Sequence, residues 1–166
     1  MVNFYIKGMS TTEEEQKQII SNFKEQDIDV IPIINDYTNY SINTIIPYIE
    51  KFINESNPNN EKINLICHSM GCNFGYLIDK NTHINIDKIV YVSPEFVGTT
   101  SKDKKEISKR YNGINYNTSV ATKPNLHNII LYYKSLKKII KSKNNLISIN
   151  NDHSLIVYSN GDVFVN

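Results

Sequence analysis

Ser69 is set among residues that favour a sharp turn in the chain. The stretch "NLICHSMGCNFG", residues 64–75, passes from an apolar run into His-Ser-Met-Gly and then into a sequence compatible with a helix. A serine hydroxyl is a useful nucleophile only when it is exposed, tightly held and within reach of a base. A turn from a parallel strand into a helix exposes the side chain, and the helix N-terminus offers N–H groups to an oxyanion. The stretch therefore predicts a nucleophilic serine at the carboxyl end of a buried strand.

The elements around this serine are expected to alternate between strand and helix. Apolar runs predict strands at 2–8, 29–34, 62–67, 88–93 and 146–149. Helical spacing of apolar residues predicts helices at 10–26, 41–56, 70–81 and 128–143. The tail 153–166 is interpreted as a short hairpin around Asn160-Gly161. Continuous apolar strands joined by helices indicate a parallel sheet covered on both faces, so we expect one compact α/β domain over residues 1–166.

Composition narrows the class of protein. The chain has 166 residues and a formal net charge of +1, which argues against a dedicated nucleic-acid binder. No apolar run approaches the roughly 18–20 residues that a membrane span needs, and the first residues predict a strand, not a signal peptide. Cys67 and Cys72 have neither zinc-ligand spacing nor the pattern of a disulfide framework. We expect a soluble, cytoplasmic protein without a metal or an organic cofactor, and the oligomeric state stays open.

The motif around the serine resembles the nucleophile elbow of the α/β-hydrolase superfamily, particularly its small esterase- and lipase-like members. Residues 67–71 read Cys-His-Ser-Met-Gly where G-x-S-x-G is usual, so Cys67 departs from the pattern with another small residue. The resemblance covers most of residues 1–97. It implies a three-layer α/β-hydrolase-like sandwich and a serine mechanism. A serine that merely caps a helix is the competing interpretation.

The resemblance also implies two backbone donors for an oxyanion. One is the N–H of Met70, directly after the serine, and the other is the N–H of Met9. Met9 follows Lys7-Gly8, where many members carry His-Gly. A glycine that simply ends the first strand is the other interpretation of Gly8.

A serine of this kind needs a histidine and a carboxylate, which family members supply later in the chain. His153 is the expected base, because it is the last histidine and is expected at the carboxyl edge of the sheet. Asp152 is the first candidate for the acid, since "DHSLIV" resembles a D-x-x-V turn after the fifth expected strand. Neighbouring residues seldom orient each other, so Glu95, after the fourth strand, is the alternative acid. The other histidines are expected in packing, loop and cap positions: His68, His83 and His127.

A basic insert follows the fourth expected strand. Residues 99–143 carry eleven Lys or Arg and two acidic residues, a net charge of +9. The resemblance implies a lid or cap over 99–127. Such a segment would attract an anionic substrate or a negatively charged membrane surface, whereas the plainer interpretation is a solvated lysine-rich helix face.

These features lead to one expected function and two alternatives. The expected function is a serine esterase or lipase-like hydrolase that cleaves the ester or thioester of a small acyl substrate through an acyl-enzyme. One alternative is a binding protein that kept the fold and lost the base. The other is an acyltransferase, which uses the same site with an acceptor other than water.

Overall fold

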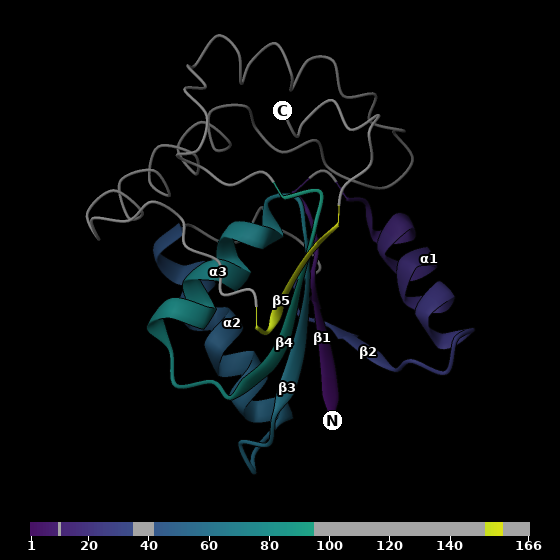
Figure 1. The fold of residues 1–166 in the computed structure, drawn as a ribbon. Helices are drawn as coiled ribbons and strands as arrows, with labels where there is room; N and C mark the ends of the chain where they lie inside the picture. The colour runs from purple at the N-terminus through teal and green to yellow at the C-terminus, as the bar shows by residue number, and fades with distance from the viewer. Residues whose placement is uncertain (10, 35–41, 95–151, 158–166) are drawn as a thin grey trace, which may run out of the picture.

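The centre of the fold is a sheet of five parallel strands in the order β2-β1-β3-β4-β5 (Figure 1). The computed structural model of the chain describes residues 1–9, 11–34, 42–94 and 152–157. The strands are β1 (Val2–Ile6), β2 (Val30–Pro32), β3 (Ile63–His68), β4 (Ile86–Val92) and β5 (Ser154–Val157). β3 is the middle strand, so its carboxyl end has a neighbour on each side.

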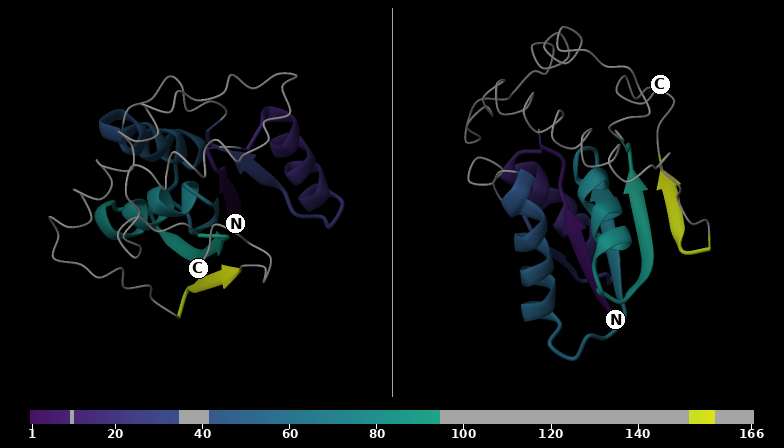
Figure 2. Two further views of the ribbon diagram at one scale, coloured as in Figure 1. Left: turned by 90° about the horizontal axis from the view of Figure 1, so that it is seen from above. Right: turned by 90° about the vertical axis from the view of Figure 1, so that its left-hand side faces the viewer.

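In the described part of the chain, three helices cover the sheet from opposite faces. They are α1 (Glu13–Lys24), α2 (Ile42–Ser56) and α3 (Gly71–Asn81). α1 lies on one face, whereas α2 and α3 lie on the other (Figures 1 and 2). The chain moves outward from β1 to β2 and then back across β1 to β3. Because crossovers between parallel strands are right-handed, this reversal puts α1 and α2 on opposite faces.

The main core lies between the sheet and the pair α2 and α3. β3 buries every second side chain, and the ring of Phe4 on β1 meets that of Phe52 on α2 edge to face, with centroids 6.4 Å apart. α3 is buried along most of its length. The largest side chains of this core are fully buried: Phe4, Ile6, Ile45, Ile49, Leu65, Phe74, Ile78 and Tyr91. The core therefore fixes α3 against β3, on either side of the turn at Ser69.

α1 begins with a capping box. The Thr12 hydroxyl accepts a hydrogen bond from the Glu15 N–H at 3.1 Å, and the Glu15 carboxylate accepts one from the Thr12 N–H at 2.7 Å. Three glutamates in the first turn complement the positive end of the helix dipole. The box fixes where α1 starts, and the turn that follows β1 ends one residue before it.

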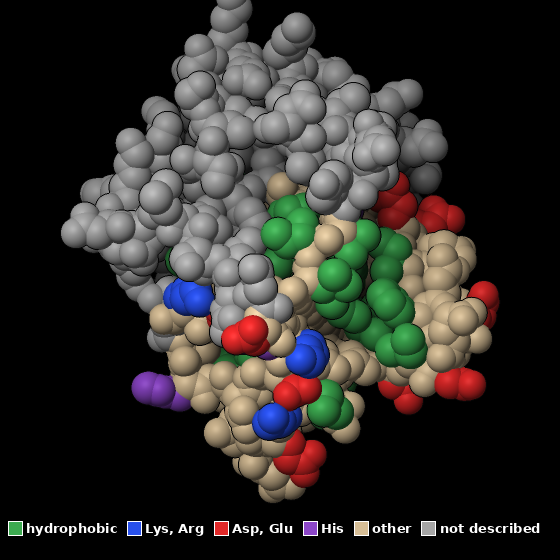
Figure 3. All heavy atoms as spheres, viewed as in Figure 1, with side chains coloured by type: hydrophobic (Ala, Val, Ile, Leu, Met, Phe, Trp, Pro, Cys, Tyr) green, Lys and Arg blue, Asp and Glu red, His purple; other side chains and the backbone are tan. Residues whose placement is uncertain are grey.

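On the α1 side, part of the sheet reaches the surface of the described structure. Figure 3 shows apolar side chains gathered beside α1. On the edge strand β5, Leu155 and Val157 are exposed, in register with Val90 and Val92 of β4. Within the residues described, no helix is both long and apolar enough to cross a bilayer.

The elements expected up to residue 93 are confirmed, and one further strand is described beyond them. The four strands and three helices expected up to residue 93 form where the sequence predicts them, and all pairings are parallel. The fifth described strand, Ser154–Val157, lies within the stretch interpreted as a hairpin and pairs parallel with β4. The second half of that stretch lies outside the described residues. The segments expected as a lid (99–127), a helix (128–143) and a strand (146–149) lie outside the described residues.

We predict that Thr12→Ala lowers the free energy of unfolding by about 1 kcal/mol, because it removes the side-chain acceptor at the start of α1. Urea-induced unfolding measures the change. Thr12→Ser keeps the hydroxyl and is expected to remain within a few tenths of a kcal/mol of the wild type. Equal losses in the two variants would contradict the capping role.

Candidate active site

Ser69 sits at a strained turn between β3 and α3. Its φ is +51°, in the left-handed region that non-glycine residues seldom adopt. Two backbone hydrogen bonds hold this conformation: the Ser69 N–H donates to the Val92 carbonyl, and the Cys72 N–H donates to the Ser69 carbonyl, both at 3.0 Å. Strain of this kind persists only where the surroundings impose it, and it is frequent at active sites. The turn leaves Ser69 half-buried at the N-terminus of α3.

Glycines on both sides of the turn allow a close approach of backbone to backbone. A Cβ on Gly71 would overlap the Ile6 carbonyl oxygen and lie 2.7 Å from that of Lys7. A Cβ on Gly8 would lie 2.9 Å from the Cβ of Ser69. Both distances are shorter than real Cβ contacts, so the end of β1 can lie against the serine only because these residues are glycines.

The cysteine that replaces the usual first glycine of the motif is matched by a glycine on α3. Cys67 is fully buried on β3, and its Sγ occupies the space that a Cβ on Gly75 would need. Ile89 closes the same space from β4, with its Cδ1 3.3 Å from that Cβ position. The turn accommodates Cys67 because α3 has a glycine, Gly75, at the position opposite it.

The sequence predicts the backbone N–H groups of Met9 and Met70 as oxyanion donors. Met70 precedes the first residue of α3, and Met9 lies in the turn that Gly8 brings against Ser69. Among the described residues, neither of these N–H groups donates a hydrogen bond. The helix dipole of α3 adds positive potential at the same place. The arrangement can stabilise negative charge that develops beside the Ser69 hydroxyl.

His68 is held by the turn after β1 and does not enter the core cluster. Its Nδ1 lies 3.3 Å from the hydroxyl oxygen of Thr11, and its side chain is half-buried. The sequence predicts His68 as a packing residue that points away from Ser69 into the core, and the contact shows that its ring lies against the turn after β1. Thr11 was not singled out from the sequence, because it reads as part of the cap of α1 and its partner is 57 residues away.

His153 lies at the amino end of β5, far from the serine. His68 is in register with Val92, and Val92 with Val157, so Ser69 stands one position beyond the level of Val157. His153 lies four residues before Val157, which makes an offset of five residues, or about 16 Å along the strand direction. The sequence predicts His153 at the carboxyl edge of the sheet, in a short loop before a terminal strand, whereas it lies at the amino end of β5. The described residues therefore do not bring His153 to Ser69.

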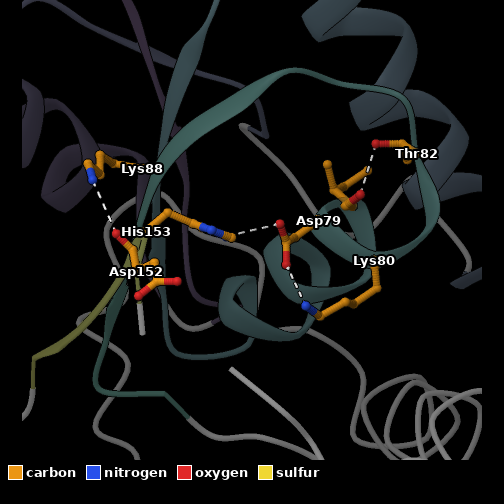
Figure 4. Close-up of polar contacts among 7 residues, drawn as sticks. Asp79, Lys80, Thr82, Lys88, Asp152 and His153 are labelled. Carbon is orange, nitrogen blue, oxygen red and sulfur yellow. Dashed lines mark hydrogen bonds and ion pairs between the residues drawn. The ribbon is translucent and has the colours of Figure 1, made fainter. Parts of the chain in front are cut away.

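At that end of the sheet, His153 lies beside the Asp79 carboxylate, which no sequence motif identifies. Its Nε2 lies 3.3 Å from an Asp79 carboxylate oxygen near the end of α3, and Lys80 lies 3.2 Å from the other oxygen (Figure 4). Asp152 is exposed, and its backbone carbonyl accepts a hydrogen bond from Lys88 at 3.3 Å. These contacts tie β5 to α3 and β4. Asp152 directly precedes His153 in the chain, so it also lies at the amino end of β5, away from Ser69.

The remaining candidates divide between exposed and undescribed positions. His83 is exposed in the loop that leads into β4, at the amino ends of the strands. Glu95 and His127 lie outside the described residues.

Burial raises the pKa of both thiols, Cys67 and Cys72, so neither competes with Ser69 as a nucleophile. In the described ranges, no three His, Cys, Asp or Glu side chains gather closely enough to hold a metal ion.

We predict that Gly75→Ala destabilises the wild type by about 1–3 kcal/mol, because the new methyl group overlaps the Cys67 sulfur. In a Cys67→Gly background the same substitution has room. The two changes are then expected to couple favourably by about 1 kcal/mol or more in a double-mutant cycle measured by urea unfolding. Additive effects would show that the two positions do not share this space.

Comparison with known proteins identifies the fold. No family model matches the sequence, and no curated protein matches it either. Among solved structures, a lipase-esterase related protein from Clostridium acetobutylicum superposes with a TM-score of 0.61 at 14% identity, over 98% of this chain and 87% of that one. A carboxylesterase structure from Nitrososphaera gargenis gives 0.58 at 12%, over 98% and 73%. An extracellular α/β-hydrolase from a Paenibacillus species gives 0.51 at 14%, over 74% and 56%. At these identities the likeness is one of architecture: the chain has the α/β-hydrolase fold.

Proposed function

We propose that this protein is a serine hydrolase that cleaves carboxylic esters or thioesters through an acyl-enzyme. The observation that carries the proposal is the left-handed Ser69 between the end of the middle strand and the start of α3, with Gly8 of the turn after β1 packed against its Cβ. The described solved structures include a carboxylesterase and a lipase-esterase related protein, which supports the same class of reaction.

In the proposed reaction, the Ser69 oxygen attacks the substrate carbonyl carbon while a base takes the hydroxyl proton. The carbonyl oxygen becomes an oxyanion and accepts hydrogen bonds from the Met9 and Met70 N–H groups. Collapse of this intermediate breaks the ester or thioester bond, and the base returns the proton to the leaving alcohol or thiol. Water then attacks the acyl-enzyme by the same steps and releases the acid. An acceptor other than water at this last step would make the protein an acyltransferase.

The described residues do not identify a base for Ser69. His153 and His83 lie at the amino ends of the strands, and the Nδ1 of His68 contacts Thr11. Elimination leaves His127 as the histidine to test first. Glu95 stays the carboxylate to test beside it, because Asp152 lies next to His153.

The competing proposal is a ligand-binding protein that kept the fold and lost catalysis. The placement of His153 and Asp152 away from Ser69 favours it. The backbone strain at Ser69 favours the enzyme, because a serine that only caps a helix does not need a positive φ. The charge of +9 on residues 99–143 supports an anionic substrate or an anionic membrane surface as the partner of either function.

We expect slow hydrolysis of short p-nitrophenyl esters by the wild-type protein and a fall of at least about 1,000-fold in kcat for Ser69→Ala, since binding and oxyanion stabilisation alone leave little rate. Ser21→Ala, on the exposed surface of α1, is the matched control and should keep the full rate. Equal rates for wild type and Ser69→Ala would favour the binding protein.

Single histidine variants test the assignment of the base. His153→Ala is expected to hydrolyse the ester within about threefold of the wild-type rate, because its separation from Ser69 exceeds hydrogen-bond reach. His127→Ala is expected to lose about 100-fold or more. A loss of that size in His153→Ala, with stability retained, would contradict the strand register that separates His153 from Ser69.

A further inference from the structure

A side-chain contact joins the turn after β1 to His68, the residue before Ser69. The turn runs from Gly8 to Thr11 and is closed by the Thr11 N–H, which donates to the Gly8 carbonyl at 3.2 Å. The Thr11 hydroxyl then meets Nδ1 of His68 at 3.3 Å. Thr11 is 8% exposed. The contact therefore joins two segments 57 residues apart at the point where both border Ser69.

The space around this contact is filled. A Cβ on Gly8 would lie 2.9 Å from the Ser69 Cβ, 3.2 Å from the His68 Nδ1 and 3.3 Å from the Thr11 hydroxyl oxygen. Both polar groups are therefore packed around the same point of the turn as the serine.

We infer that Thr11 and His68 are positioning residues that fix the direction of the Met9 N–H toward the reacting carbonyl. The inference rests on the proposed function. Met9 lies inside this turn, between Gly8 and Thr11, which the closing hydrogen bond joins. Loss of the Thr11 contact would let the turn shift relative to Ser69, and a displacement of about 1 Å in such a group lowers the rate by about 100-fold.

The hydrogen-bonding groups of Thr11 and His68 suit a structural contact better than a proton relay. With a neutral imidazole protonated at Nε2, the Thr11 hydroxyl donates to Nδ1. With a protonated imidazole, Nδ1–H donates to the hydroxyl oxygen. The contact persists in both states, so His68 can hold the turn without exchanging a proton with the substrate.

The experiment compares the steady-state hydrolysis of a p-nitrophenyl ester by three threonine variants of the full chain. Thr11→Val keeps the shape and removes the hydroxyl, and it is expected to lower kcat by about 10–100-fold with KM changed less than about threefold. Thr11→Ser restores the hydroxyl and is expected within about threefold of the wild type. Thr82→Val makes the same substitution at the far end of α3, where the hydroxyl bonds to the Ile78 carbonyl, and should leave kcat unchanged.

A second pair of variants tests the histidine. His68→Asn places an amide near the position of Nδ1 and should keep kcat within about tenfold of the wild type, whereas His68→Gln, which reaches the position of Nε2, should lose as much as Thr11→Val. Loss of all activity in both would show that the imidazole reacts and would overturn the positioning role.

The outcomes separate this inference from the proposed function. Hydrolysis that depends on Ser69 but is unchanged in Thr11→Val overturns the positioning role alone. The absence of any Ser69-dependent hydrolysis in the wild type overturns both. A parallel loss of thermal stability in Thr11→Val and Thr82→Val, with a lower kcat only in Thr11→Val, supports the inference, because a general weakening of the fold would affect both.

Discussion

The left-handed backbone at Ser69 is the constraint on which the rest of the site depends. A residue with a Cβ adopts this conformation at a cost of about 1–3 kcal/mol, so its neighbours must hold it there. The sheet supplies one support through the Val92 carbonyl, and α3 supplies another through the Cys72 N–H. Both supports exist because β3 is the middle strand and α3 is packed against it by the main core. The same turn aims the N-terminus of α3 at the serine.

This constraint also explains the pattern of small residues. Gly8 and Gly71 are needed because the end of β1 lies against the turn, and Gly75 is needed because Cys67 takes the volume opposite it. The motif therefore tolerates a cysteine at its first position when α3 compensates. A comparison of the motif letters alone counts Cys67 as a defect, whereas the packing shows a local exchange of volume.

Local sequence signals predicted most of the fold. The apolar runs, the capping residues of α1 and the short loops identified β1 to β4 and the three helices, and the motif placed Ser69 at the turn. The pairing of β5 with β4 could not be predicted in the same way, because it joins segments that are far apart in the chain. This pairing places His153 and Asp152 at the amino end of the sheet, whereas the sequence predicts the carboxyl end. The contacts of Thr11 with His68 and of Asp79 with His153 join residues that are far apart in the chain, so sequence spacing cannot predict them.

Backbone strain and close packing at one serine are among the features of an activated nucleophile, and reactivity is the property that they predict. The most direct measurement is the reaction of the wild-type protein with a fluorophosphonate, followed by mass spectrometry of its peptides, since such a probe modifies serines that are activated for attack. The account predicts one modified residue, Ser69, and no modification of Ser69→Ala. An unmodified protein, or modification at another serine, would contradict it.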